Sequence, residues 1–89
     1  MRRSRRDIML QILDSAKKGK LKTKIMYEAG LSYSQLEEYL PLLQGMGLLR
    51  IDKEYNPKYR EIYRTTPKGR EYAKLIRKLK SMEGTNPFT

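Results

Sequence analysis

The side chains best suited to chemistry in this 89-residue sequence are its cations: twenty Lys and Arg against ten Asp and Glu, a net charge of +10. Such a charge attracts polyanions, so nucleic acids and anionic membranes are the first partners to consider. No apolar run approaches the ~20 residues that a membrane-spanning helix requires. The cations are also spread along the chain, not gathered on one amphipathic helix. The charge pattern therefore favours nucleic acid.

Catalytic chemistry has few candidate residues. The sequence contains no histidine and no cysteine, which excludes disulfides, Cys/His zinc sites and the most common acid–base residue. It has no Gly-rich loop of the kind that cradles phosphates. Glu37 and Glu38 are neighbours on a predicted helix, so their side chains diverge. We expect a protein that is not an enzyme and needs no metal or cofactor, and no small-molecule ligand is evident.

The cations lie in two segments that flank an acidic one. Residues 1–24 carry a net charge of +7 and residues 50–89 carry +6, whereas residues 25–49 contain no Lys or Arg and carry −3. The first segment opens with a basic arm over residues 1–6 and ends with five Lys among residues 17–24. The candidate phosphate-binding side chains therefore belong to the two flanking segments.

Two helices are predicted in the first third of the chain. Apolar residues at helical spacing predict one over about residues 7–18, which Gly19 ends. Thr23 is a suitable N-cap for a second, short helix over residues 24–29. Gly30 then supplies the left-handed residue that ends this helix.

A third helix is predicted to begin after Ser32. Ser32 and Gln35 have the spacing of a capping box, and the apolar stripe of the helix then runs through Pro41. A proline inside a helix costs about 3 kcal/mol because it cannot donate a hydrogen bond to the preceding turn. Because the apolar stripe continues through Pro41, we expect one kinked helix and not two helices. Two short helices joined around a glycine are the helix-turn-helix pattern.

A β-hairpin is predicted next, over residues 48–52 and 59–65, because both runs contain β-branched and aromatic residues. The residues between them, 53–58, are rich in turn-forming and basic residues and would form the tip of the hairpin. A hairpin that follows a helix-turn-helix is a wing.

A last helix follows the hairpin. Thr66 and Pro67 suit its N-cap and first position, and its apolar pattern runs to about Met82. The predicted fold is mainly α with a small β-hairpin (α+β), in the order helix-helix-helix-strand-strand-helix: a winged helix-turn-helix. One domain is expected over residues 7–82, with the basic arm before it and a flexible tail over residues 83–89.

Two stretches resemble a known family. The first consists of the run Ala29 to Tyr33, the pairs Gln35-Leu36 and Tyr39-Leu40, then Leu43, and the run Gly47 to Leu49. The second, Tyr63 to Gly69, resembles the junction between the wing and the last helix of many winged-helix regulators. Together they are similar to the winged-helix family of archaeal predicted transcriptional regulators, which includes the archaeal ten-kilodalton DNA-binding proteins. The resemblance covers about residues 8–79.

This resemblance implies DNA binding, with the helix after Ser32 as recognition helix and the turn over residues 53–58 as wing. It also implies homodimers, joined in some members by a long C-terminal helix that pairs as a coiled coil. The last helix predicted here stops near Met82 and departs from those members in length. An apolar seam on this helix is the expected dimer interface: Tyr72, Leu75, Ile76, Leu79 and Met82.

Phosphate contacts are the best supported part of the predicted interface, because cations and a helix N-terminus both favour an anion. The predicted contacts are the basic residues of the arm, the lysine cluster and the wing: Arg2, Arg3, Arg5, Arg6, Lys20, Lys22, Lys24, Lys53, Lys58 and Arg60. Tyr55 or Tyr59 in the wing is expected to pack on a sugar. The alternative is a solvated basic surface that keeps a small protein soluble.

Base readout is less clear, because the predicted recognition helix has no Arg or Lys for the common bidentate contact to guanine. Its expected outward-facing residues, the candidates for base contact, are Tyr33, Ser34, Gln35, Glu37 and Glu38. Gln can read adenine and Glu can accept from cytosine N4, but Gln35 is occupied if it completes the capping box. The alternative is an ordinary solvated helix face.

Seven tyrosines are interleaved with the cations, a pattern that suggests base stacking. Tyr39, Tyr63 and Tyr72 fall on inward-facing stripes and are expected in the core. The tyrosines left as candidate contact residues are Tyr33, Tyr55 and Tyr59.

We therefore predict a sequence-specific or semi-specific double-stranded DNA-binding protein, a transcriptional regulator acting as a homodimer in the cytoplasm, in association with the nucleoid. One alternative is an architectural or chromatin protein with little sequence preference, since backbone contacts alone carry no sequence information. Another is a winged helix used as a protein-interaction module. Double-stranded RNA is a further alternative partner, although the helix pair and wing suit the B-form major groove better.

Overall fold

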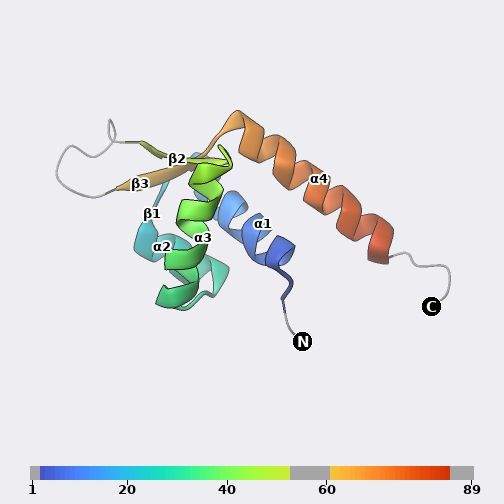
Figure 1. The fold of residues 1–89 in the computed structure, drawn as a ribbon, viewed down its shortest axis with the longest axis horizontal. Coiled ribbons are helices and arrows are strands. Elements are labelled where there is room, and N and C mark those ends of the chain that lie inside the picture. Colours follow the sequence, from blue (N-terminus) through green and yellow to red (C-terminus); the bar gives the residue numbers. More distant parts are fainter. Residues whose placement is uncertain (1–2, 53–60, 85–89) are drawn as a thin grey trace.

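The computed structural model describes residues 3–52 and 61–84 of the chain. Its elements in chain order are α1 (Arg5–Ser15), the 3-10 helix η1 (Ala16–Lys18), β1 (Lys20–Leu21), α2 (Lys22–Ala29), α3 (Tyr33–Gly45), β2 (Leu49–Asp52), β3 (Ile62–Thr65) and α4 (Pro67–Gly84). Figure 1 shows α1, α2 and α3 gathered at one end of the molecule, with the sheet above them and α4 running away from it. The predicted mainly helical fold with a wing-like strand pair is confirmed, with one additional strand.

The additional strand is β1, which turns the predicted hairpin into a three-stranded sheet of order β1-β3-β2. Both pairings are antiparallel, and Tyr63 of the central strand lies opposite Ile51 on one side and Lys20 on the other. Leu49 and Thr65 are opposite each other on the buried face. The sheet thereby fixes the lysine-rich segment before α2 to the base of the wing.

The hydrophobic core lies between the helices and the inner face of the sheet. Its most completely buried side chains include Ile12 and Leu13 of α1, Ile25 of α2, and Leu36 and Leu43 of α3. They recur at the helical spacing seen in the sequence, which is why each helix turns one stripe inward. Helices α1, α2 and α3 therefore pack into one unit that supports the surface side chains described below.

The first helix begins two residues before the predicted position. Ser4 is its N-cap: the Asp7 amide donates to the Ser4 hydroxyl at 3.1 Å, and the Ser4 amide donates to the Asp7 carboxylate at 3.0 Å. This capping box satisfies amides that would otherwise lack partners at the helix start. Arg5 and Arg6 are consequently part of α1, not of a flexible arm. The predicted end at residue 18 is reached by η1, which follows α1 directly.

The second helix also begins earlier than predicted. It starts at Lys22, and its N-cap is Leu21, which provides no side-chain hydrogen bond. Thr23, the predicted N-cap, therefore lies inside the helix, because the pairing of β1 with β3 brings the chain into position at Leu21. The predicted end is confirmed: Gly30 adopts a left-handed φ of 63°, the conformation that glycine adopts at least cost.

The capping box of α3 is confirmed. The Gln35 amide donates to the Ser32 hydroxyl at 3.1 Å, and the Ser32 amide donates to the Gln35 side-chain oxygen at 3.0 Å. Pro41 lies inside α3, which is one continuous helix over 13 residues. Pro41 is exposed while Leu40 and Leu43 are buried, so the apolar stripe fixes the helix in spite of the proline.

The junction between β3 and α4 follows the predicted capping pattern. The Gly69 amide donates to the Thr66 hydroxyl at 2.9 Å, and Pro67 is the first residue of α4. Gly69 packs so closely on the chain before β2 that an added Cβ would lie 2.2 Å from the Leu48 carbonyl oxygen. The helix extends to Gly84, two residues beyond the predicted end.

The two wing strands are shorter than predicted. β2 begins at Leu49, one residue after the predicted start, and β3 begins at Ile62, with Glu61 outside the strand. The predicted tip over residues 53–58 and the first residues of the second predicted strand, 59–60, lie outside the described residues.

Candidate nucleic-acid interface

The helix-turn-helix consists of α2, the turn through Gly30, and α3. The inward stripe of α3 leaves Tyr33, Ser34, Glu37 and Glu38 exposed along the first two turns. Tyr33 has 63% of its surface accessible. These four side chains form the polar face that α3 presents to a partner.

Every acidic residue of α2 and α3 has a basic partner from the N-terminal segment. Glu37 pairs with Lys22, Glu28 pairs with Lys20, and Glu38 lies 3.6 Å from Arg5. The charge of −3 in residues 25–49 is therefore matched on this surface by three cations from residues 1–24. The helix pair is acidic in sequence but electrically balanced in the folded protein.

Lys22 occupies the central position in this arrangement. Its ammonium group contacts Glu37 and lies 5.2 Å from the centroid of the Tyr33 ring, a cation–π distance. The hydrogen bond to Glu37 is the main cause that raises the pKa of Lys22. Hydrogen bonds from Lys22 and then Tyr33 lower the pKa of the Glu37 carboxyl. Both groups are therefore charged at neutral pH.

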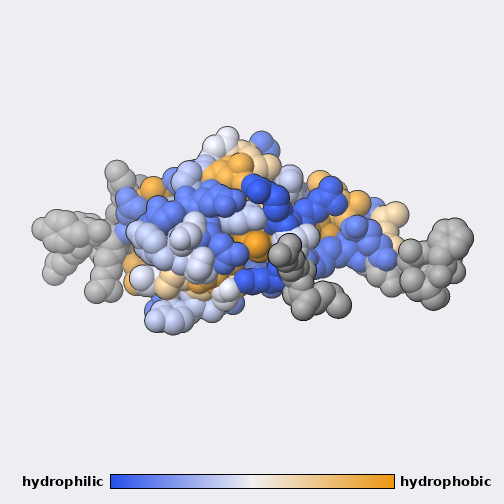
Figure 2. Space-filling view, turned by 60° about the horizontal axis from the view of Figure 1, so that its bottom comes forward, coloured by the Kyte–Doolittle hydropathy of each residue, from blue (hydrophilic) through white to orange (hydrophobic). Residues whose placement is uncertain are grey.

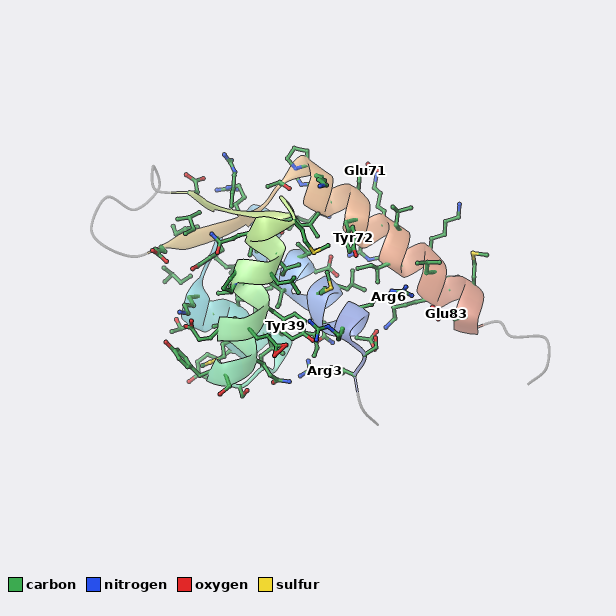
Figure 3. The ribbon with its side chains drawn as sticks, viewed as in Figure 1. Arg3, Arg6, Tyr39, Glu71, Tyr72 and Glu83 are labelled. Carbon is green, nitrogen blue, oxygen red and sulfur yellow. The ribbon has the colours of Figure 1, made fainter. Side chains whose placement is uncertain are left out.

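Two arginines of the predicted arm are fixed to the fold. Arg3 donates to the carbonyl oxygens of Ala29 and Gly30, at the C-terminal end of α2, and also to Gln11. Arg5 lies 5.3 Å from the centroid of the Tyr39 ring. Figure 3 shows Arg3 just below α1, close to the helix pair. Cations at a helix C-terminus interact favourably with its carbonyls, so Arg3 stabilises the helix-turn-helix.

Within residues 3–52 and 61–84, seven cations have no side-chain hydrogen bond or ion pair. They are Arg6, Lys17, Lys18, Lys24, Arg50, Arg70 and Lys78. Of the predicted phosphate contacts in the described part of the chain, only Arg6 and Lys24 belong to this group. Lys24 is exposed in the first turn of α2, where the helix dipole also favours an anion.

Some of the other predicted contacts lie on α3, and the rest lie outside the described residues. Gln35 is occupied by its capping box, and Ser34 is exposed and free of such a role. Six predicted contacts lie outside the described residues: Arg2, Lys53, Tyr55, Lys58, Tyr59 and Arg60.

Tyr27 is an exposed aromatic that the sequence analysis did not single out. It has 80% of its surface accessible, more than Tyr33. The helical spacing of the sequence could have predicted this exposure. Ile25 and Ala29 define the buried stripe of α2, and a residue midway between them must point outward. Tyr27 and Tyr33 are thus the two aromatics that the helix-turn-helix exposes among the described residues.

The tyrosines predicted in the core are confirmed there, with Tyr72 at its edge. Tyr39 and Tyr63 are buried, and Tyr72 packs against the core while half-buried. The Tyr63 hydroxyl donates to Glu61 at 3.0 Å. Burial and then this hydrogen bond raise the pKa of Tyr63 to about 12.

The predicted seam on α4 has an inner and an outer part. Ile76 is 3% exposed and belongs to the core of its own chain. Figure 3 shows Tyr72 of the same helix beneath α4. Leu75, Leu79 and Met82 are 58%, 42% and 65% exposed. These three are the exposed members of the predicted seam, and Tyr72 is half-buried. Figure 2 shows hydrophobic surface among hydrophilic residues toward the α4 end of the molecule.

Two other classes of site are not found among the residues that the structure describes. No cluster of three or more acidic side chains is arranged to hold a metal ion there. No helix in residues 3–52 and 61–84 combines the length and hydropathy needed to cross a membrane.

Comparison with known proteins agrees with this architecture. A family model described as winged helix-turn-helix matches residues 2–84. The chain is similar to the crystal structure of Sso10a-2, a DNA-binding protein from Sulfolobus solfataricus, with a TM-score of 0.84 and 29% sequence identity, covering 93% of this chain and 84% of that one. The comparison with curated proteins gives no match. The chain belongs to the winged helix-turn-helix family, in agreement with the archaeal winged-helix resemblance of its sequence.

Proposed function

We propose that this protein binds double-stranded DNA through α2 and α3, with α3 as the recognition helix. The observation that carries the proposal is the winged helix-turn-helix itself, which presents the exposed face of α3 beside the basic start of α2. The similarity to a protein described as DNA-binding and the net charge of +10 support it.

The phosphate contacts proposed in the described region centre on the first turn of α2. Lys24 is exposed and unpaired among the described residues, and Lys22 lies two positions earlier, held by Glu37. A phosphate placed there would meet the amides of the helix N-terminus and the ammonium group of Lys24. Arg6 is a further contact on α1, and the predicted wing residues complete the site.

The base contacts proposed for α3 are few. Ser34 can donate or accept, and the carboxylates of Glu37 and Glu38 can accept from cytosine N4 once their cations turn to phosphates. Tyr33 offers a ring for apolar contact. Because α3 has no Arg or Lys, its sequence preference is expected to be modest.

We further propose that the protein is a transcriptional regulator that acts as a homodimer at the nucleoid. The exposed outer side of α4, with Leu75, Leu79 and Met82, supports the dimer. Sedimentation equilibrium tests it: the chain should be dimeric and Leu79→Glu monomeric. A wild-type monomer at all concentrations would reject the dimer and leave the DNA-binding proposal in place.

An architectural role is the second candidate, favoured by one observation. The carboxylates of α3 are paired with cations and the helix has no base-reading cation, so binding through the backbone alone suits this face. Such a protein would bind any duplex and act by its abundance, not by a defined operator.

The test of DNA binding is the affinity of the full chain for a random-sequence duplex over a series of salt concentrations. Log affinity should fall linearly with log salt, with a slope of roughly −0.9 for each phosphate neutralised. Tight binding to random duplex favours the architectural role, and weak binding with the same salt dependence favours a specific regulator. Absence of binding at low salt would reject DNA binding and leave the protein-interaction module as the function.

A further inference from the structure

A cleft between α1 and α4, outside the helix-turn-helix, combines a buried floor with cations that have no internal partner. Its volume is about 360 Å³, near the lower end of the range for small-ligand sites. The floor is formed by Leu13, Ala73 and Thr65, which are 1%, 4% and 3% exposed. The Thr65 hydroxyl donates to the Leu13 carbonyl at 2.6 Å and ties β3 to α1 beneath the cleft.

Four cations and two carboxylates line the walls of this cleft. Arg77 pairs with Asp14 across it, and Lys74 lies 3.7 Å from Glu71 along α4. Each of the two carboxylates therefore already forms an ion pair with a cation of the cleft. The charge of the cleft is not balanced by its own residues.

The two cations left over are Lys17, in η1 directly after α1, and Arg70, in the first turns of α4. Neither has a side-chain hydrogen bond or ion pair with any residue in the described part of the chain. They line the same cleft from opposite helices. Lysine supplies a compact charge and arginine a planar fork, a combination that suits the oxygens of a phosphate group.

We propose that this cleft binds a phosphate group, held between Lys17 and Arg70, with any small organic substituent packed on Leu13 and Ala73. Two sources carry this chemistry: a small phosphate monoester free in solution, or a backbone phosphate of nucleic acid. Because the site joins α1 to α4, occupation ties together the two helices that carry it. The proposal does not depend on DNA binding by α2 and α3.

The first experiment titrates inorganic phosphate and phenyl phosphate into the isotopically labelled full chain at constant ionic strength and follows the backbone amides by NMR. Saturable shifts should appear at residues 13–17 and 65–77, with phenyl phosphate binding more tightly because its ring covers the apolar floor. Shifts that do not saturate, or that appear equally at all cations, would overturn the proposal.

Substitutions separate the site from general charge attraction. Lys17→Gln and Arg70→Gln should each weaken phenyl phosphate binding about fivefold or more. Lys78→Gln is the matched control, since Lys78 is also an exposed cation of α4 without a partner in the described residues but does not line the cleft. Equal weakening by Lys78→Gln would overturn the assignment. The thermal midpoints of the unliganded variants should match that of the wild type, which excludes misfolding.

A competition experiment identifies the source of the phosphate. If the natural ligand is a backbone phosphate, saturating duplex DNA displaces phenyl phosphate and Arg70→Gln weakens duplex binding. If it is a free monoester, phenyl phosphate and duplex bind together, and Arg70→Gln leaves duplex affinity unchanged. A chain that binds duplex but shows no saturable phosphate site would overturn this inference and leave the proposed function intact.

Discussion

The ammonium group of Lys22 is paired with the carboxylate of Glu37, so the first turn of α2 is tied to the exposed face of α3. The Tyr33 ring lies beneath the same ammonium group. A phosphate that binds Lys22 would compete with Glu37 for this ammonium group, and a released carboxylate would then face the DNA. If Lys22 contacts DNA as proposed, the pair should make binding by the helix-turn-helix weaker than its cation content suggests.

Glu37→Gln should raise the affinity for a random-sequence duplex about two- to fivefold, because it removes the competitor of the phosphate at Lys22 in an exposed pair. The measurement is a titration of labelled duplex at constant salt. Glu83→Gln removes the same charge at the far end of α4 (Figure 3) and should leave the affinity unchanged. Equal gains in both variants would mean that overall charge, not the pair, limits binding. A loss of affinity in Glu37→Gln would mean that the carboxylate itself contacts DNA.

Arg3→Ala should destabilise the folded protein by about 1 kcal/mol, since its guanidinium group donates to the carbonyls that end α2. For a domain of this size the thermal midpoint would fall by about 4–8 °C. Arg6→Ala is the matched control, because Arg6 is an exposed arginine without a polar partner among the described residues, and its midpoint should stay close to that of wild type. Similar midpoints for both variants would contradict the capping role of Arg3.

Gly69→Ala should destabilise the fold by about 1–3 kcal/mol or more, because its Cβ would collide with the backbone before β2. Gly45→Ala makes the same chemical change where an added Cβ meets nothing within 4 Å. It should stabilise α3 by about 0.5 kcal/mol, since alanine loses less backbone entropy than glycine. Chemical denaturation of the two variants compares them directly, and a Gly69→Ala protein as stable as wild type would contradict the packing at this junction.

Tyr63 should contribute a pH-dependent part of the stability. The folded state raises its pKa from 10.0 to about 12, so the folded chain holds this proton more tightly than the unfolded chain. The contribution is complete below pH 10 and is lost as the pH rises from 10 toward 12. The denaturation midpoint of wild type should therefore fall more steeply over this interval than that of Tyr63→Phe. Parallel curves would show that the hydroxyl makes no such contribution.

Most features that depend on short-range spacing were predicted, although the N-cap of α2 is Leu21 and not the predicted Thr23. The capping box of Ser32 and Gln35, the left-handed Gly30 and the start of α4 at Pro67 all lie within a few residues of their signals. The Ser4–Asp7 box at the start of α1 has the same form, but it was not predicted, and the helix was expected to begin at Asp7.

The remaining features depend on contacts between distant residues. Strand β1 has two residues and forms only because β3, about forty residues later, pairs with it, so no local pattern predicts it. Lys22 and Arg5 pair with Glu37 and Glu38, which lie 15 and 33 positions away in the sequence. These ion pairs compensate the negative charge of the acidic segment, residues 25–49. Sequence spacing therefore predicted which side chains face outward but not which cations remain free.

The most direct test of DNA binding by the helix-turn-helix compares Lys24→Gln with Lys78→Gln. Both residues are exposed cations without partners in the described part of the chain, one on α2 and the other on α4. The measurement is the slope of log duplex affinity against log salt for wild type and both variants. Lys24→Gln should bind more weakly and reduce the slope by roughly 0.9, the loss of one phosphate contact, while Lys78→Gln should match wild type. An unchanged slope in Lys24→Gln, or an equal reduction in Lys78→Gln, would contradict the placement of DNA on α2 and α3.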